Sequence, residues 1–198
     1  TAFKSSHLLF FSGGIGMTPF IGMIKQLALF SSYPESVHVH WFLSIRQANE
    51  LNVLSNLSNF IEENVSNLID LKHISVDIHV NLTDERSNSA RDKVHDYHPD
   101  TLNSFYGLPT SFIRIVSIEI GRIQRDDISY VLRKDNISPS KTEIYLCGPQ
   151  GFMNTVTSYF PEYFLEKIHT RGSNSRQTGY IYTYMPGWRH IITSDYTR

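Results

Sequence analysis

Residues 7–22 constrain the fold of this chain more than any other stretch. They open with the apolar run 8–11, which is typical of a strand buried on both faces. Three closely spaced glycines follow, and beyond them apolar residues recur at the spacing of one helix face. We therefore predict a buried strand that turns tightly into a helix, with Thr18 as the N-cap and Pro19 as the first helical residue.

The glycine turn, residues 13–19, has the sequence Gly-Gly-Ile-Gly-Met-Thr-Pro. Because glycine has no Cβ, backbone N–H groups and the helix N-terminus can approach a phosphate closely at such a turn. No Gly-Lys-Ser/Thr follows, which excludes a P-loop here. Glycines also form ordinary tight turns. The turn by itself therefore leaves two interpretations open, a phosphate-binding turn and a plain strand-to-helix connection.

The composition indicates a globular chain without a strong charge. Its 198 residues are 40% hydrophobic and carry a net charge of -1, which allows one domain with a full core. We expect no nucleic-acid partner, and no membrane-spanning segment because no apolar run approaches about 20 residues. The one cysteine, Cys147, excludes an intrachain disulfide and fits a reducing, intracellular compartment, mitochondrial or cytoplasmic.

Strand and helix patterns alternate along the chain. Apolar patterns predict strands at residues 8–11, 37–43, 74–80, 142–147 and 164–169. Helical spacing follows the first, second and fourth strands, and a further helix runs from Asp126, as cap or first-turn acid, to about residue 133. Such alternation implies right-handed crossovers and parallel pairing. We predict a doubly wound α/β fold with a five-stranded, mostly parallel sheet.

Two segments depart from the alternation. Residues 81–121 are polar and interrupted by proline and glycine, and a structureless stretch of this length is uncommon inside a compact domain. We interpret them as an exposed, partly mobile insertion that contains a short strand at 112–118. Residues 171–198 show no convincing period, so we predict a domain over 1–170 followed by an irregular, divergent tail.

Three turns come directly after predicted strands, at residues 13–16, 44–46 and 147–149. Doubly wound sheets bind ligands beyond the carboxyl ends of their strands, near the switch in strand order. We therefore expect the three turns to face a common site.

In this order, the turns resemble those of the nicotinamide-dinucleotide domain of the ferredoxin–NADP reductase family, which includes cytochrome b5 reductases and ferric reductases. The resemblance rests on residues 13–19, on Cys-Gly-Pro at 147–149, and on Gly-Arg-Ile at 121–123 followed by an acidic helix start. It covers roughly residues 7–169. The fold that it implies is the ferredoxin reductase-like C-terminal NADP-linked domain.

The resemblance implies that NAD or NADP binds here and that NAD(P)H passes a hydride to FAD. The FAD would be bound mainly by a flavin domain that lies upstream or in trans, so the enzyme would be an NAD(P)H-dependent flavin oxidoreductase, incomplete without that domain. Because the first strand begins at about residue 7 with almost no lead-in, we expect this chain to be a fragment. The alternative is a non-catalytic, nucleotide-responsive or interaction module that has lost the flavin half.

The resemblance also implies roles for individual residues. The pyrophosphate would lie against Gly13, Gly14, Ile15, Gly16, Met17, Thr18 and Pro19. Ser44 and Arg46 would lie beside the adenosine ribose, where an arginine could pair with a 2′-phosphate; the alternative is a solvent-exposed loop arginine. Cys147 would sit near the nicotinamide as the catalytic candidate, beside a wall formed by Gly148 and Pro149. The alternative for Cys147 is a small buried residue that ends a strand.

Other chemistry has less support in the sequence. Among nine histidines, His38 and His40 share one face of a predicted strand, and His95 and His98 lie in a predicted loop. A zinc site usually needs three or four ligands at productive spacing, so we predict no metal site. No Gly-x-Ser-x-Gly nucleophile elbow occurs, which leaves a hydrolase without support.

Overall fold

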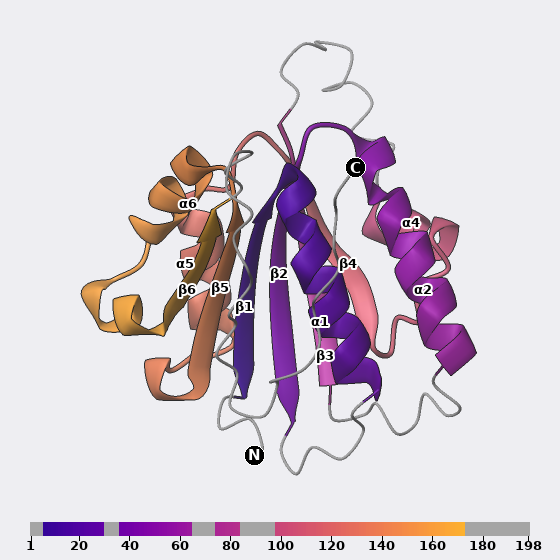
Figure 1. Ribbon diagram of the computed structural model, residues 1–198, viewed down its shortest axis with the longest axis horizontal. Coiled ribbons are helices and arrows are strands. Elements are labelled where there is room, and N and C mark those ends of the chain that lie inside the picture. The colour runs from indigo at the N-terminus through magenta and orange to yellow at the C-terminus, as the bar shows by residue number, and fades with distance from the viewer. Residues whose placement is uncertain (1–5, 30–35, 65–73, 84–97, 173–198) are drawn as a thin grey trace, which may run out of the picture.

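The computed structural model describes residues 6–29, 36–64, 74–83 and 98–172. Its strands pair in parallel in a six-stranded sheet with the order β4-β3-β2-β1-β5-β6 (Figure 1). The strands are β1 (His7–Gly13), β2 (Val37–Ile45), β3 (Ile74–Leu82), β4 (Ile113–Ile120), β5 (Thr142–Gly148) and β6 (Ile168–Gly172). The doubly wound α/β prediction is therefore confirmed.

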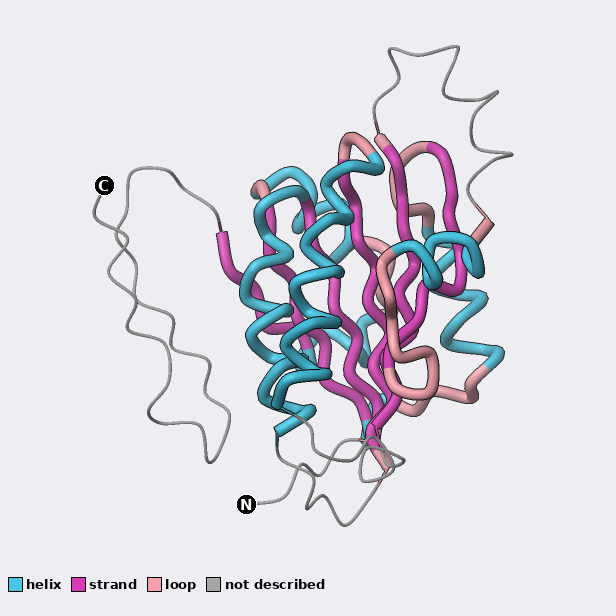
Figure 2. Tube along the Cα trace, turned by 90° about the vertical axis from the view of Figure 1, so that its right-hand side faces the viewer, coloured by secondary structure: helices cyan, strands magenta, loops and turns pink. Residues whose placement is uncertain are grey.

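Helices cover both faces of the sheet, which Figure 2 shows nearly edge on. The helices are α1 (Thr18–Leu29), α2 (Val53–Asn64), α4 (Pro99–Phe105), α5 (Arg125–Lys134) and α6 (Gln150–Thr157). Short 3-10 turns connect several elements, namely η1 (Gly14–Met17), η2 (Ala48–Asn52), η4 (Pro139–Lys141) and η5 (Glu162–Lys167). Helices α1, α2 and α4 pack on one face, and α5 and α6 pack on the other.

Strand β1 is central and buried on both faces. Leu8 and Phe10 belong to the larger core, beneath α1 and α2, whereas Leu9 and Phe11 belong to the smaller core, beneath α5 and α6. All four side chains are fully buried. A strand with helices on both sides presents no face to water, which is why its sequence is a continuous apolar run.

Strand β4 corrects the predicted strand count and part of the predicted insertion. It lies within residues 81–121, where Ile113 and Ile115 are buried against the larger core. The Asn103 side chain of α4 ties the two elements together, because it accepts from the Ile115 N–H at 2.7 Å and donates to its carbonyl oxygen at 3.0 Å. The short strand expected at 112–118 is thus confirmed as β4, but the sequence did not place it in the main sheet, because its other face is polar and partly exposed, as an edge strand allows. Residues 84–97 lie outside the described part.

The last strand differs in detail from the prediction, and the start of α5 decides between the two roles predicted for Asp126. The predicted strand at 164–169 is mostly η5, whose Phe164 is buried in the smaller core, and β6 begins only at Ile168. At the start of α5 the N-cap is Gln124, whose backbone N–H donates to the Asp127 carboxylate at 2.8 Å. Asp126 is a first-turn acid and not the cap. The predicted tail lies outside the described residues beyond 172.

Within the described residues, no helix combines the length and the apolar character that crossing a membrane requires.

Candidate nucleotide-binding site

The switch in strand order lies between β1 and β5. From β1 the chain continues to β2, β3 and β4 on one side, and it reaches β5 and β6 on the other side only afterwards. The predicted turns at 13–16 and 147–149 lie at the carboxyl ends of β1 and β5, although Gly13, Cys147 and Gly148 are still strand residues. The predicted turn at 44–46 is wrong in detail, because Ser44 and Ile45 complete neighbouring β2 and only Arg46 lies beyond it. All three turns therefore lie along the edge of the sheet where such folds bind ligands.

The turns after β1 and β5 are in direct contact. A Cβ added at Gly16 would lie 2.3 Å from the carbonyl oxygen of Cys147 and 2.7 Å from its carbonyl carbon. A Cβ at Gly148 would lie 3.2 Å from the backbone nitrogen of Gly13. Side chains at these positions would push the two backbones apart. Glycine therefore allows the close approach of the two turns.

Gly14 requires glycine because of its backbone conformation and not because of a close contact. Its φ of +54° lies in the left-handed region, where other residues are strained. A Cβ at this position would meet nothing within 4 Å, so the space in front of the backbone is open. The neighbouring Ile15 side chain is 79% exposed. An open backbone without a Cβ, at the switch in strand order, is the geometry that lets main-chain N–H groups approach an anion.

The turn continues into α1 through η1, which corrects the predicted cap. Thr18 has helical dihedrals, φ -54° and ψ -47°, and its hydroxyl donates to the Ile15 carbonyl oxygen at 3.0 Å instead of capping the helix. The helical turns begin upstream, at Gly14, because the 3-10 turn precedes the α-helix. Pro19 lies in the first turn of α1, where its fixed φ suits the start of a helix.

The electrostatics of this helix start favour an anion. Helix α1 directs its N-terminal end, with the positive end of its dipole, toward the edge of the sheet that carries the turns. Neither η1 nor the first turn of α1 contains an acidic residue. No carboxylate in the first turn would therefore repel a bound anion.

Ser44 and Arg46 lie on the same edge as the glycine turn. Ser44 pairs in register with Gly13, so the end of β2 adjoins the turn after β1. Arg46 is exposed just beyond β2, and its backbone N–H donates to the Glu50 carboxylate at 2.9 Å. The carboxylate also accepts from the Gln47 N–H at 3.0 Å, which shapes the loop that carries Arg46. Both sequence interpretations of Arg46 remain predictions.

Cys147 is 7% exposed and contributes to the larger core. The backbone carbonyl of Cys147 lies against Gly16 at the site, whereas the residue as a whole is buried. Pro149 is exposed beside it, at the start of α6. The expected role of Cys147 near a nicotinamide stays a prediction.

Two supports of the turn were missed in the sequence. The buried indole of Trp41 donates to the Ser12 hydroxyl at 2.8 Å directly below the turn. The ring of Phe152 packs against the turn, because a Cβ on Gly13 would lie 3.2 Å from its Cγ. Helical spacing after the fourth predicted strand indicates a helix there, but it does not specify the surface that Phe152 contacts.

Comparisons with known proteins found one family model and several solved structures. Residues 5–160 match the model of the ferric reductase NAD-binding domain. A search of curated proteins found no match. Similar solved structures include the flavohemoglobin of Malassezia yamatoensis with bound FAD and heme (21% identity, TM-score 0.49, covering 85% of this chain and 32% of that one). Another is the flavohem-like FAD/NAD-binding domain of nitric oxide dioxygenase from Vibrio cholerae O1 biovar El Tor (17% identity, TM-score 0.46, covering 85% of this chain and 51% of that one).

The ferredoxin–NADP+ reductase of Plasmodium falciparum is similar at 16% identity and a TM-score of 0.47, covering 85% of this chain and 52% of the reductase chain. This chain therefore spans between about a third and a half of the length of these solved chains. The family model matches well over half of the sequence, from residue 5 to residue 160. On that match, the chain belongs to the ferric reductase NAD-binding domain family.

Proposed function

We propose that this chain is the pyridine-nucleotide half of a flavin-dependent oxidoreductase and that it binds NADH or NADPH at the carboxyl ends of β1, β2 and β5. The observation that carries the proposal is the direct contact of the turns at 13–16 and 147–149 at the switch in strand order, next to the open backbone at Gly14. The family match supports the same ligand class.

The pyrophosphate would lie against residues 13–19. Backbone N–H groups of the turn and the dipole of α1 would hold the negative charge, and no first-turn carboxylate opposes it. The lack of a Cβ at Gly14 leaves room for a phosphate to approach the main chain.

The ribose end would lie beside the end of β2. Ser44 pairs in register with Gly13, and Arg46 lies just beyond the end of β2. A guanidinium there can pair with a 2′-phosphate through two parallel hydrogen bonds. We infer from Arg46 a preference for NADPH.

The nicotinamide end would lie beside residues 147–149. Cys147 would contact the ring, and Gly148 and Pro149 would form the wall that orients it and excludes water. Bound NAD(P)H would supply a hydride, and FAD held by a flavin domain outside these 198 residues, upstream or in trans, would accept it. Within the family, we also infer from the turns at 13–19 and 147–149 a resemblance to oxidoreductase NAD-binding domain-containing protein 1.

Calorimetric titration of the chain with NADH and with NADPH tests the proposal. We expect saturable heat from at least one nucleotide. A Gly14→Val variant should lose it, because the new side chain would occupy the open space in front of the turn. Gly22→Val is the matched control, since Gly22 lies within α1 with nothing within 4 Å of an added Cβ. No heat at millimolar nucleotide from folded wild-type protein would refute the proposal.

A second measurement separates the enzyme from the non-catalytic module. The protein is mixed with FAD and NADH, and flavin bleaching is followed in the absence of oxygen. A rate above that of free flavin supports the reductase half. Binding of the nucleotide without any increase in bleaching, even after addition of a flavin domain, would instead favour a nucleotide-responsive module.

A further inference from the structure

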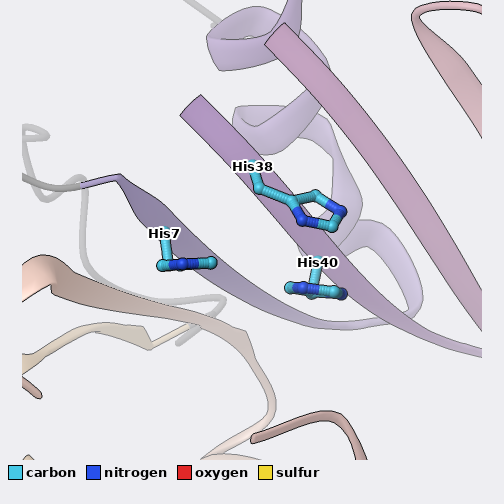
Figure 3. Close-up of side chains that lie close together, drawn as sticks. All are labelled: His7, His38 and His40. Carbon is cyan, nitrogen blue, oxygen red and sulfur yellow. The ribbon is translucent and has the colours of Figure 1, made fainter. Parts of the chain in front are cut away.

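Three histidines converge at the edge of the sheet opposite the nucleotide-binding turns. His7 opens β1, and His38 and His40 lie near the start of β2, with His7 paired in register with His38 (Figure 3). By the alternation of side chains along a strand, all three share the sheet face that α5 and α6 partly cover. One ring nitrogen from each histidine lies within 4.8 Å of the other two.

The cluster holds buried nitrogen atoms whose hydrogen-bonding capacity is unused. Nδ1 of His7 and Nε2 of His40 are buried without a hydrogen-bond partner among the described residues. His40 as a whole is 2% exposed. Buried polar atoms are nearly always paired, and an exception calls for a specific cause such as a bound ion.

Nδ1 of His40 faces His79, which leaves Nε2 as the ring nitrogen available to a metal ion. Nδ1 of His40 lies 3.5 Å from Nε2 of His79, and Nδ1 of His79 lies 3.1 Å from the Ser117 hydroxyl. If each ring donates through its Nδ1–H, Nε2 of His40 keeps its lone pair.

Two carboxylates complete the surroundings. Asp135, at the C-terminal end of α5, places Oδ2 3.0 Å from Nε2 of His40, although the two atoms are not aligned for a hydrogen bond. A cation beside the two atoms would be bound by both the nitrogen lone pair and the carboxylate. Asp77 lies 3.2 Å from Nε2 of His38 and also accepts from Arg114 at 2.8 Å. A carboxylate that orients a histidine in this way is typical of the groups behind metal ligands.

We propose that His7, His38 and His40 bind a divalent transition metal ion, with zinc as the best fit, and that Asp135 lies at the fourth position. Three neutral imidazoles and a carboxylate are ligands that zinc accepts in a tetrahedral site. Nitrogen atoms around a zinc ion stand about 3.3 Å apart, from Zn–N bonds of about 2.0–2.1 Å, so small ring rotations close the cluster around the ion. The prediction of no metal site did not consider His7.

Cobalt binding tests the site, with the 198-residue chain carrying no histidine tag. One equivalent of Co²⁺ should give visible absorption bands of tetrahedral intensity, which Zn²⁺ should abolish by displacement. His7→Asn and His38→Gln should each weaken binding by more than about 100-fold, and Asp77→Asn, which acts through His38, by about 10–100-fold. His98→Gln is the matched control, because His98 is an exposed histidine outside the cluster.

Circular dichroism establishes that each variant is folded before it is titrated. A folded wild-type chain without a one-equivalent cobalt spectrum would overturn the proposal, as would a spectrum that survives both His7→Asn and His38→Gln. The site does not rest on the proposed function, since it lies at the opposite edge of the sheet. NAD(P)H binding should therefore be the same in the histidine variants as in the wild type.

Discussion

Replacing Gly16 by alanine tests the contact on which the nucleotide site depends. The added Cβ would stand 2.3 Å from the carbonyl oxygen of Cys147, 2.7 Å from its carbonyl carbon and 3.0 Å from Cα of Gly148. All three atoms belong to the backbone, so no side-chain rotation can relieve the overlap. The turn and the end of β5 must separate by at least about 0.7 Å to bring the shortest contact to 3.0 Å.

The size of the effect follows from that separation. Overpacking in a well-packed region costs about 1–3 kcal/mol, and a clash with backbone on both sides belongs at the upper end, so we expect a loss of about 3 kcal/mol in the free energy of unfolding. For a domain of this size, that loss lowers the midpoint of thermal unfolding by about 6–12 °C. Nucleotide affinity should fall as well, because the two turns no longer meet at the same spacing.

Two other glycines serve as matched controls for the same substitution. Gly14→Ala adds a Cβ in open space but at φ +54°, so it should cost only about 1–2 kcal/mol. Gly22→Ala lies in the interior of α1 with nothing nearby, and it should stabilise the protein by about 0.4–1 kcal/mol. Urea unfolding followed by circular dichroism measures all three. If Gly16→Ala were no more costly than Gly14→Ala, the close contact between the two turns would be wrong.

Three further predictions concern the surroundings of the site. Arg46→Ala should weaken NADPH binding by about 10-fold or more and leave NADH binding unchanged, because only NADPH has a 2′-phosphate; equal losses in calorimetry would contradict this role. Trp41→Phe removes the 2.8 Å hydrogen bond to the buried Ser12 hydroxyl, so the free energy of unfolding measured in urea should fall by about 1–3 kcal/mol. A loss below about 0.5 kcal/mol would mean that the hydrogen bond contributes little. A chain that ends at residue 172 should keep both its nucleotide affinity and its unfolding midpoint, and a loss of either would place residues beyond 172 in the domain.

Much of the fold follows from local patterns in the sequence. The apolar run at 8–11 predicts a strand covered on both faces, because only such a strand has no polar side. The glycines and proline after it predict a tight turn into a helix, because they change which backbone conformations are allowed. The same reasoning places the ends of β2 and β5 within two residues, although Ser44 and Ile45, predicted in a turn, belong to β2.

Errors arose where a local pattern had two explanations. The polar face of β4, with Arg114 and Glu119, has the composition of an exposed loop, and only its pairing with β3 makes it part of the sheet. Phe164 belongs to an apolar run that fits a strand, yet a 3-10 turn buries it equally well. Thr18 is a good capping residue, but the helical turns begin upstream of it, at Gly14.

By itself, the sequence determined that the chain is α/β, where the buried strand β1 turns into a helix, and which residues lie at strand ends. Only the tertiary structure decided that Gly16 rests on the Cys147 carbonyl and that His7 meets His38 and His40. The physical reason is that periodicity records which side of an element is buried, whereas the neighbours of a strand are selected by packing among segments far apart in the chain.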